Sequence, residues 1–453
     1  MGLQFVKLLA LIASSAAAQT SGSFSLLSYN VAGLPEILSS GNPIVDTPLI
    51  SPRLGPFNII NVQEDFNFND VLYANDNHTF RTPTSGIAGI GSGLNTLSDF
   101  PFFDLDRVKW SSCNLNNGDC LTPKGFTFAR IRVSDGFWFD LYNLHGDAGD
   151  EAGDINARAS NLAQLTTYAQ TASIGMPVVV MGDTNTRYTR VGDSESLHSL
   201  IDALEVTDAW VSFVRDGSFP AEGADALVCA FPFPAGTTQA EMVACEVVDK
   251  IFVRGSSIVS IRSITFTNED DAFVDSAGAP LSDHYPVSSV VSWTLSSLLR
   301  LADYLGGTGG TFYNDLATVL SSPTLPKITS LTIRSGSRVD ALAFTAQFSN
   351  GTTTTVTHGG TGGSPTTLTL ASGEYVTKVQ ACEGVHNSIR IFFASFTTNL
   401  GRTLSGGVAT SDCISTTVPT DPAAGSANWG LVGFWGRSGD EVDRFGAIWG
   451  AAY

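Results

Sequence analysis

The chain has 453 residues, and 24 Lys and Arg against 43 Asp and Glu give a formal net charge of −19. Apolar residues make up 43% of the chain and charged residues only 15%, which excludes intrinsic disorder, collagen and coiled coil. The length allows two or three domains, and 45 Gly with 28 Phe favour a protein rich in strands and loops. Beyond the N-terminus, no apolar run reaches the roughly 18 residues that a membrane helix needs.

Residues 1–18 have the pattern of a secretory signal peptide. Lys7 precedes an apolar stretch, and residues 16–18 are the small alanines that cleavage requires. The alternative interpretation is a buried N-terminal helix. We expect the mature chain to begin near Gln19 and the protein to be secreted.

The six cysteines fit an extracellular protein, because disulfides persist in oxidising compartments. No Cys-x-x-Cys pair is present, which argues against a zinc site. Many connectivities are open to six cysteines. Pairing sequence neighbours keeps each bridge within one domain, so we expect Cys113–Cys120, Cys229–Cys245 and Cys382–Cys413.

The sequence changes character near residues 296–303. Residues 19–296 hold 14 Lys and Arg against 33 Asp and Glu, whereas residues 297–453 hold 9 against 10. The first part mixes β-branched runs with helix-like stretches such as Ala157–Gln170 and Ser194–Ala209, and the second part is dense in Gly, Thr and Ser. We therefore expect two domains, 19–296 and 302–453. They can pack closely, since no long linker separates them.

Apolar strand candidates in the first part each end in a polar cluster. Asn, Glu, His and Asp at the ends of buried strands indicate one site at the rim of a sheet. Helix-like stretches between the strands favour a layered α/β sandwich. The candidates are Phe24–Ser28, Phe57–Val62, Phe137–Leu144, Pro177–Met181, Val247–Val253 and Val287–Trp293.

The polar clusters contain the groups needed for water to attack a phosphate ester. Glu64 and Asn30 offer hard oxygen ligands for a divalent cation such as Mg²⁺. His145 and His284 can transfer protons near neutral pH. A metal that neutralises phosphate and a His–Asp pair that activates water would together make a hydrolytic site.

Asp183 and Asn185 lie two residues apart on an extended segment, so they face the same side. Each motif alone also has an ordinary structural explanation. Residues 182–185 read equally well as a β-turn, and a single histidine at a strand end is commonly structural. Six such clusters in one order are harder to explain without a shared site.

In that order the clusters resemble the endonuclease/exonuclease/phosphatase superfamily, metal-dependent phosphoesterases with the deoxyribonuclease-like fold. The resemblance implies a four-layer α/β sandwich over almost all of the first part. The matching segments lie within residues 24–292 and are Ser28–Asn30, Val62–Glu64, Asn143–His145, Gly182–Asn185, Asp249–Phe252 and Ser282–Pro286.

The resemblance also implies roles for particular residues. Mg²⁺ or another divalent cation would bind at Glu64, with Asn30 and Asp283 in the same metal site. His284 would act as general base. The remaining catalytic positions would be Asp249, which orients that base, His145, the second catalytic histidine, and Asp183 and Asn185, which hold phosphate and the attacking water.

The segment Cys113–Cys120, followed by Lys124-Gly-Phe126, is similar to secreted neutral sphingomyelinases. The negative charge also favours a lipid head group over nucleic acid, because it repels polyanions. A secreted nuclease and an inositol-phosphate phosphatase on the same scaffold are the alternatives. The acidic residues from 147 to 154 are candidates for a second cation site, although a solvated loop explains them more simply.

The second part carries two paired-glycine loops, Gly306–Gly310 and Gly359–Gly363. With Ile333–Asp340 and Gly433–Gly439, these loops resemble jacalin-related lectins, whose fold is an all-β prism of three four-stranded sheets. The resemblance implies glycan binding by a Gly-x-x-x-Asp loop, in which a carboxylate accepts sugar hydroxyls. The implied sugar-binding residues are Gly439, Asp440, Glu441, Val442 and Asp443, together with Gly309 and Gly310.

The sequence thus predicts a secreted, Mg²⁺-dependent phosphodiesterase that a lectin domain directs to glycosylated surfaces. A prism kept only for packing or docking is one alternative. A lectin with an inactive catalytic half is another. The head group, the sugar and the oligomeric state stay open.

Overall fold

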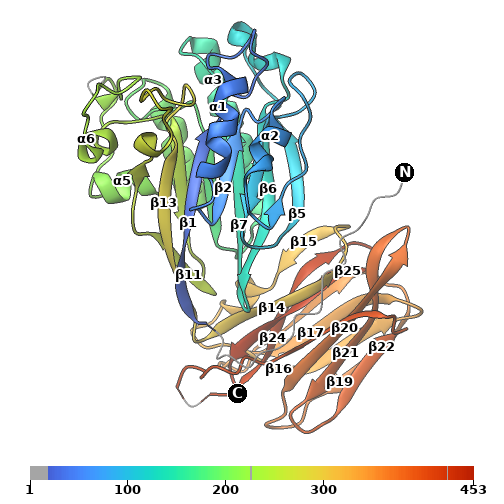
Figure 1. The fold of residues 1–453 in the computed structure, drawn as a ribbon. Coiled ribbons are helices and arrows are strands. Elements are labelled where there is room, and N and C mark those ends of the chain that lie inside the picture. Colours follow the sequence, from blue (N-terminus) through green and yellow to red (C-terminus); the bar gives the residue numbers. More distant parts are fainter. Residues whose placement is uncertain (1–18, 225–226, 426) are drawn as a thin grey trace.

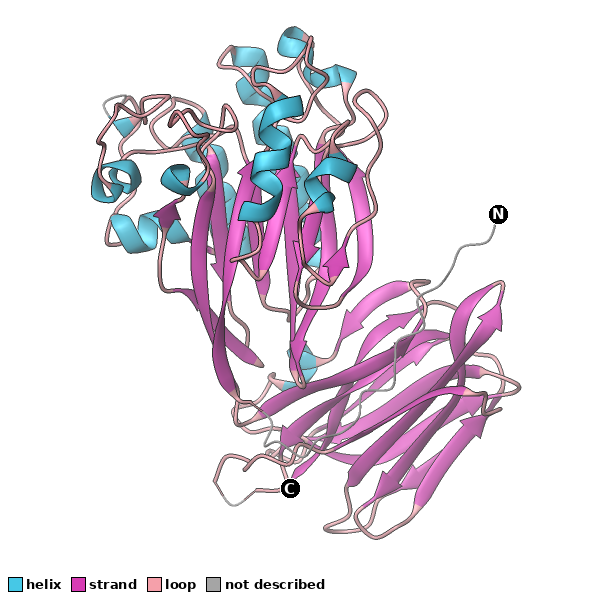
Figure 2. Ribbon diagram, in the orientation of Figure 1, coloured by secondary structure: helices cyan, strands magenta, loops and turns pink. Residues whose placement is uncertain are grey.

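The structure is a computed structural model that describes residues 19–453 except 225, 226 and 426, so the predicted signal peptide lies outside the described residues. Residues 19–295 form a body of strands and helices, here called the sandwich, and residues 299–453 form a body made almost wholly of strands, here called the prism (Figures 1 and 2). Among the described residues, no helix has the length and apolar character to cross a membrane.

Two sheets form the centre of the sandwich. The first has the order β11-β13-β1-β2-β4-β3, with β12 paired to β13, and the second has the order β5-β6-β7-β8-β10-β9. The strands of the first are β1 (Ser21–Asn30), β2 (Ile59–Gln63), β3 (Phe80–Arg81), β4 (Asn95–Ser98), β11 (Val259–Ser263), β12 (Thr267–Asn268) and β13 (Val287–Leu295). Those of the second are β5 (Phe102–Lys109), β6 (Gly125–Ser134), β7 (Phe137–His145), β8 (Val178–Asp183), β9 (Thr207–Asp208) and β10 (Asp249–Arg254).

The strand register brings the polar ends of both sheets to one end of the sandwich. β1 and β2 are parallel, with Asn30 opposite Gln63. β7 and β8 are parallel, with His145 opposite Asp183, and antiparallel β10 places Asp249 opposite the same Asp183. The polar residues that follow distant segments of sequence therefore lie along one rim.

The sheets pack face to face through apolar side chains, and helices cover their outer faces. Phe24 of β1 stacks on Phe139 of β7 with 5.4 Å between ring centroids. The buried cluster of Leu27, Ile50, Ile60 and others joins the first sheet to its helices. The helices are α1 (Pro43–Ile50) and α2 (Asn69–Ala74) beside the first sheet, α3 (Ala152–Ala172), α4 (Asp193–Leu204) and α5 (Ala209–Val214) beside the second, and α6 (Gln239–Ala244), which contacts α5 and β12 of the first sheet; short 3-10 turns are η1 (Ser51–Arg53), η2 (Asn116–Leu121) and η4 (Asp270–Ala272). This confirms the four-layer α/β sandwich.

The helix expected at Ala157–Gln170 lies within α3, but the stretch Ser194–Ala209 is divided. α4 ends at Leu204 because Glu205 adopts a left-handed conformation with φ of 54°. Asp208 then caps α5, since its side chain accepts hydrogen bonds from two backbone amides of that helix. The sequence pattern alone missed this break.

The prism has three four-stranded antiparallel sheets, as expected. Their orders are β14-β25-β24-β15, β18-β17-β16-β19 and β22-β21-β20-β23. The strands are β14 (Leu299–Gly306), β15 (Thr311–Asn314), β16 (Lys327–Ser335), β17 (Val339–Gln347), β18 (Thr353–Gly359), β19 (Ser364–Thr369), β20 (Val376–His386), β21 (Ser388–Thr398), β22 (Thr403–Gly407), β23 (Asp412–Thr417), β24 (Trp429–Ser438) and β25 (Val442–Ala451), with the short helix α7 (Leu316–Val319).

The sandwich and the prism share one continuous apolar core, in agreement with the close packing expected from the absence of a linker. Trp435 of the prism lies edge-on to Trp138 of the sandwich, at 5.5 Å between centroids. The Arg444 guanidinium contacts both carboxylate oxygens of Asp104 at 2.6 Å. Trp138 lies near the start of β7, so the prism packs at the end of the sandwich opposite the polar rim (Figure 1).

The three predicted disulfides are confirmed. Cys113–Cys120 and Cys229–Cys245 lie in the sandwich, and Cys382–Cys413 joins β20 to β23 in the prism. The described residues include no free cysteine. Each bridge therefore stabilises one body rather than joining the two.

Candidate active site and sugar-binding loop

Asn30 and Glu64 meet where β1 and β2 end. The Asn30 side-chain nitrogen Nδ2 lies 3.3 Å from Glu64 Oε1 and 3.1 Å from Asp183 Oδ2, and its Oδ1 accepts the Ala32 amide at 3.1 Å. Asn30 thus turns its donor toward the carboxylates. In this arrangement Asn30 is placed to orient Glu64, and its membership of the metal site stays a prediction.

The backbone at Glu64 has a φ of 56°, a conformation that residues other than glycine seldom adopt. Two glycines make room for it. A Cβ added to Gly33 would lie 2.6 Å from the Glu64 carbonyl oxygen, and one added to Gly93 would lie 3.0 Å from Glu64 Cα. Burial raises the pKa of Glu64, and the nearby charge of Lys124 partly opposes that rise. Strain and burial together fix the carboxylate at the rim.

Asp183, at the end of β8, is the centre of the cluster and is fully buried. Its Oδ2 lies 3.3 Å from His145 Nε2 and 3.5 Å from His284 Nε2. Its Oδ1 accepts a hydrogen bond from the Asn185 backbone N–H at 2.9 Å. Burial alone would raise the pKa of Asp183. The positive charge of His284, together with that of Lys124 and the hydrogen bond from Asn30, outweighs burial, so the pKa of Asp183 is lowered and the carboxylate is ionised.

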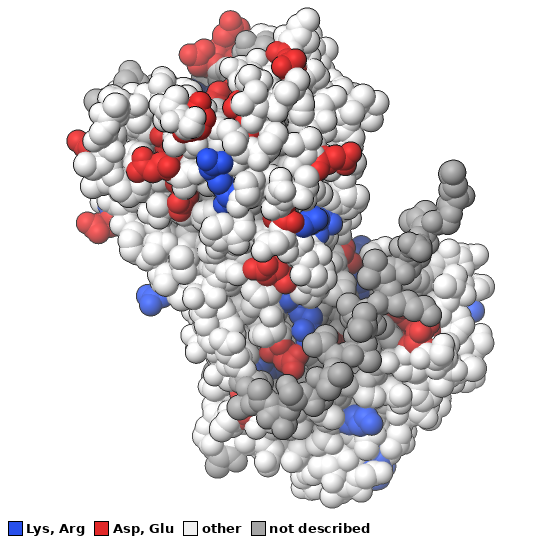
Figure 3. All heavy atoms as spheres, in the orientation of Figure 1, with Lys and Arg blue, Asp and Glu red and all other residues white. Residues whose placement is uncertain are grey.

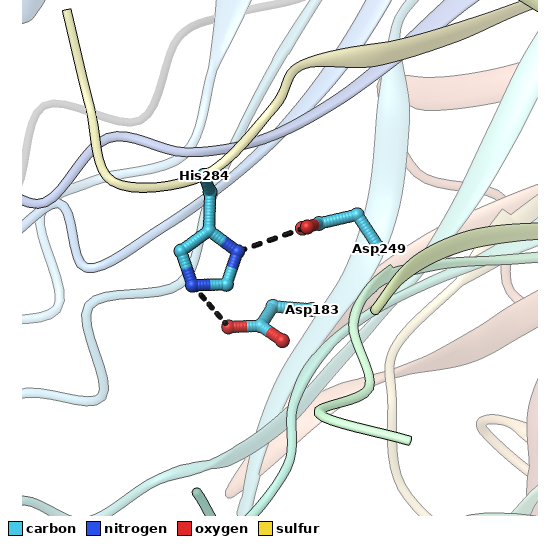
Figure 4. A group of neighbouring side chains, drawn as sticks. All are labelled: Asp183, Asp249 and His284. Carbon is cyan, nitrogen blue, oxygen red and sulfur yellow. Dashed lines mark hydrogen bonds and ion pairs between the residues drawn. The ribbon is translucent and has the colours of Figure 1, made fainter. Parts of the chain in front are cut away.

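His284 lies between two aspartates, as Figure 4 shows. Its Nδ1 is 2.9 Å from Asp249 Oδ2, and its Nε2 faces Asp183. Burial lowers the pKa of His284, but the Asp183 and Asp249 carboxylates raise it well above the usual histidine value. Burial raises the pKa of Asp249 to about 6, although His284 opposes the rise. The two carboxylates therefore stabilise the protonated form of the His284 imidazole.

His145, at the end of β7, is kept neutral. Burial and the charge of Lys124 lower the pKa of His145 to about 3, against the opposing effect of Asp183. Its Nδ1 is buried without a hydrogen-bond partner among the described residues. Its Nε2 lies 4.0 Å from Glu64 Oε1. A neutral imidazole in this place can donate a hydrogen bond from Nε2 to a phosphate oxygen.

Asn185 and Asp283 complete the predicted set. Asn185 has a φ of 52°, and its Nδ2 donates to the Gly146 carbonyl at 3.3 Å. Asp283 is exposed and accepts a hydrogen bond from the Ser40 hydroxyl. The structure thus gathers Asn30, Glu64, His145, Asp183, Asn185, Asp249 and His284 at one rim, with Asp283 at its mouth.

Sequence reasoning missed the residues that support this rim from below. Gln63 Nε2 donates to Asn143 Oδ1 at 2.8 Å, and Asn143 Nδ2 donates to the Val62 carbonyl at 3.0 Å. These buried amides join the two sheets directly under the site. Lys124 donates to the Gly146 carbonyl at 3.3 Å, and the sequence pattern assigns it no role of its own.

The acidic residues from 147 to 154 serve the fold. Asp154 accepts hydrogen bonds from the Glu151 amide at 2.9 Å and from Asn114 Nδ2 at 2.8 Å, and so caps α3. Asp147 accepts the Asn114 amide at 2.7 Å. Asp147 and Asp154 are thus buried and hydrogen-bonded, so they do not form the solvated loop expected from the sequence, and these contacts give both carboxylates a structural role.

The chemistry of the rim fits a divalent cation. Asp183, Asp249 and His284 each offer a ligand atom within 4.8 Å of the others, and Glu64 adds a carboxylate 4.0 Å from His145. Asp249 Oδ1 is buried without a partner among the described residues. Hard carboxylate oxygens that outnumber nearby cations are the donor set that Mg²⁺ or Ca²⁺ prefers.

The predicted sugar-binding loop lies at the turn between β24 and β25. Asp443 is 1% exposed, its Oδ1 is paired with Arg390 Nη1, and its Oδ2 has no partner among the described residues. A Cβ at Gly309 would lie 2.5 Å from Asp443 Oδ1, and one at Gly310 would lie 2.6 Å from Oδ2. Only glycine therefore fits beside this carboxylate, and the unpaired oxygen can accept a sugar hydroxyl.

The other members of the loop differ in their surroundings. Gly439 donates its amide to the Glu441 carbonyl at 3.1 Å, Asp440 is exposed, and Val442 is buried. Glu441 is paired with Arg338, whose Nε lies 2.7 Å from Oε2. Arg338 and Arg390 come from other strands and turns, and sequence reasoning missed both.

Two family models match this chain, one in each body. The Endonuclease/Exonuclease/phosphatase family 2 model matches residues 44–233, and the Jacalin-like lectin domain model matches residues 302–448. The chain joins an endonuclease/exonuclease/phosphatase domain to a jacalin-like lectin domain. We refer to them as the EEP domain, which is the sandwich, and the lectin domain, which is the prism.

Curated relatives match the EEP domain. Proteins named sphingomyelinase from Mycobacterium tuberculosis (strain H37Rv) and Mycobacterium bovis are 37% identical over 276 residues, which cover 59% of this chain and 52% of each relative. The chain thus spans about half the length of the curated relatives that it matches. The name sphingomyelinase is that of the relatives.

Solved structures resemble each domain separately. AcmJRL, a mannose-binding jacalin-related lectin from Ananas comosus, is 28% identical with a TM-score of 0.28 and covers 34% of this chain and 99% of that chain. A magnesium-bound variant of beta toxin from Staphylococcus aureus is 15% identical with a TM-score of 0.42 and covers 59% and 99%.

Proposed function

We propose that this protein is a secreted phosphodiesterase that uses a divalent cation, Mg²⁺ by preference, to hydrolyse sphingomyelin or a similar choline phosphodiester. The observation that carries the proposal is the position of His284 between Asp249 and Asp183, beside Glu64. The name of the relatives that match the EEP domain supports the substrate class. The predicted signal peptide and the three disulfides support secretion.

In this proposal His284 acts as the general base. Asp249 accepts a hydrogen bond from Nδ1 at 2.9 Å, which fixes the tautomer and leaves Nε2 to take a proton from water. The 3.5 Å separation between Nε2 and Asp183 is longer than an ordinary hydrogen bond, so Asp183 does not hold Nε2. A divalent cation beside the carboxylates would oppose their effect on the His284 pKa and would favour the neutral imidazole that a general base requires. Both aspartates then stabilise the imidazolium that forms.

The remaining rim residues orient the substrate. Neutral His145 and the side-chain amide of Asn185 donate hydrogen bonds to phosphate oxygens, and Asp183 holds the attacking water. Glu64 would hold the divalent cation, with Asn30 fixing its carboxylate. Such a cation supplies positive charge that neutralises the phosphate and stabilises the charge that develops during hydrolysis.

The lectin domain is proposed to bind glycans and so to hold the enzyme near glycosylated surfaces. The unpaired Asp443 Oδ2, beside glycines that admit no larger side chain, supports this role. A carboxylate oxygen in such a pocket accepts hydrogen bonds from sugar hydroxyls.

The substrate class is tested by offering sphingomyelin liposomes and linear DNA in parallel, with Mg²⁺ present and the His284→Ala variant as the blank. Release of phosphocholine by the unaltered protein, with intact DNA, is the expected result. Cleavage of DNA alone would replace the proposal with a nuclease on the same scaffold. It would also show that the net charge of −19 does not exclude a polyanionic substrate.

A further inference from the structure

Six large aliphatic side chains lie exposed around the end of the EEP domain that carries the candidate active site. Single exposed aliphatic residues are common on protein surfaces, but a group at one end marks an interaction surface. We call this group the apolar rim. It consists of Ile37, Leu38, Ile87, Ile90, Leu115 and Leu121, which are 92%, 66%, 53%, 72%, 84% and 76% exposed.

The loops that carry the apolar rim contact one another. The Asn67 amide donates to the Gly33 carbonyl at 3.3 Å, and Asn67 Oδ1 accepts the Ala88 amide at 3.2 Å. These bonds join the loop of Ile37 to the loop of Ile87 through the segment that follows Glu64. A Cβ added to Gly89 would lie 3.8 Å from the Leu121 carbonyl oxygen, so the loop of Ile87 also meets the loop that carries Leu115 and Leu121.

The same loops are fixed to the active site. The Ser40 hydroxyl donates to Asp283, which directly precedes His284. The Cys113–Cys120 disulfide closes the loop that carries Leu115. The exposed aliphatic side chains are therefore held around the site, on loops that the fold has already ordered.

The apolar rim carries very little charge. Residues 31–42, 84–92 and 113–122 include no Lys or Arg and only two acids, Glu36 and Asp119. Asp119 is buried and paired with Lys124, so it adds no net charge. The nearby Asp150 and Glu151 are exposed acids. In Figure 3, the end of the EEP domain farthest from the lectin domain shows red and white spheres but no blue ones.

We propose that the apolar rim is a docking surface for a lipid bilayer with zwitterionic head groups. The proposal rests on the proposed function, because the phosphodiester of a bilayer lipid reaches His284 only if this end of the domain meets the bilayer. Aliphatic side chains enter the boundary between head groups and acyl chains. The lack of basic residues and the flanking acids disfavour an anionic bilayer, which usually recruits Lys and Arg.

The docked orientation places the lectin domain away from the lipid. The active site lies at the carboxyl end of β7, and the lectin domain packs near the start of that strand. A strand of nine residues spans roughly 30 Å. The glycans that the lectin domain meets would then stand above the bilayer surface rather than among the head groups.

The test measures sedimentation of the full-length His284→Ala protein with vesicles, so that binding is separated from hydrolysis. The vesicles contain phosphatidylcholine and sphingomyelin. Substituting Ile37 and Leu38 together by Ser removes two of the aliphatic side chains, and Ile87 with Ile90 gives a second, independent pair. The matched control substitutes Leu400 and Val408 by Ser, because these residues are similarly exposed, at 62% and 57%, in the lectin domain.

Each rim pair is expected to lower the partition coefficient at least about tenfold, and the control pair is expected to leave it unchanged. With His284 restored, the rim variants should hydrolyse the water-soluble diester bis(4-nitrophenyl) phosphate at the rate of the unaltered protein. Replacing a third of the phosphatidylcholine by phosphatidylserine should weaken binding.

Unchanged vesicle binding by both rim pairs would overturn the proposal. A loss of soluble diester hydrolysis as large as the loss of vesicle binding would also overturn it, because it would show damage to the site. So would a dimer in sedimentation analysis that the rim substitutions abolish. Vesicle binding without any sphingomyelin hydrolysis would leave the docking surface supported and the proposed function wrong. The two failures are therefore distinguishable.

Discussion

The active site of the EEP domain and the sugar loop of the lectin domain each hold a buried aspartate, but they neutralise it differently. Asp183 faces His145 and His284, whose charge changes with protonation. Asp443 is paired with Arg390, which stays charged at all accessible pH values. In the proposed function, the same side chain therefore lies beside a group that transfers a proton in one domain and beside a fixed charge at the predicted sugar loop in the other. The partner, rather than the aspartate, sets the chemistry.

The strongest test of this contrast removes the titratable partner. His284→Ala should lower phosphodiester hydrolysis by at least about two orders of magnitude, because no other group is placed to take the proton from water. Initial rates on sphingomyelin liposomes would measure the effect. The exposed His386 of the lectin domain provides a matched His→Ala control. A near-normal rate in the His284 variant would show that the Asp249–His284 pair is structural.

The shared core predicts that the two domains unfold together. Trp435→Ala removes a fully buried ring that contacts Trp138 and Tyr304. It should cost about 3–5 kcal/mol of unfolding free energy, as large-to-small core substitutions do. Differential scanning calorimetry is expected to show one transition in the unaltered protein, displaced to lower temperature in the variant. Two separate transitions in the unaltered protein would contradict a common core.

The fixed-charge site is tested through Asp443→Ala. Loss of a charged hydrogen-bond acceptor should weaken glycan binding about tenfold or more without changing phosphodiester hydrolysis. A glycan array would identify the sugar and measure the loss, and Asp412→Ala, at an exposed position on β23, serves as the control. Unchanged binding in the Asp443 variant would indicate that the lectin domain is a packing module.

The smallest effect is expected at the pair of Arg338 and Glu441. Both side chains are partly exposed, at 22% and 16%, and such ion pairs contribute at most about 1 kcal/mol. Arg338→Ala should therefore change glycan affinity by less than about fivefold. Arg402→Ala removes another ion pair of the lectin domain, with the buried Glu374, and gives a control for the loss of an arginine. A loss as large as that of Asp443→Ala would make Arg338 part of the sugar site itself.

The sequence predicted the site well where a motif lies at a strand end. The polar ends of β1, β2, β7 and β8 are adjacent in space because parallel and antiparallel pairing brings those ends to one rim. The sequence order and the apolar runs contain that information. The prism was predicted by the resemblance to jacalin-related lectins.

What the sequence could not predict depends on contacts between distant segments. Arg390 and Asp443 are 53 residues apart, and nothing local to either residue indicates the pair. The direction in which the Asn30 amide points depends on Asp183, which is 153 residues away. The left-handed backbone at Glu64 needs the space that Gly93 provides on another strand connection. Such features follow from packing, and local patterns do not show them.

The central claim is that Glu64 and the Asp183–His284–Asp249 cluster hydrolyse a phosphodiester with the help of a divalent cation. The most direct measurement is phosphocholine release from sphingomyelin liposomes in Mg²⁺, in EDTA, and after Mg²⁺ is restored, for the unaltered protein and for Glu64→Gln. The account predicts activity that EDTA abolishes and Mg²⁺ restores, with at least about a hundredfold loss in the variant whenever Mg²⁺ is present. Activity that persists in EDTA, or a Glu64→Gln variant with a near-normal rate, would contradict it.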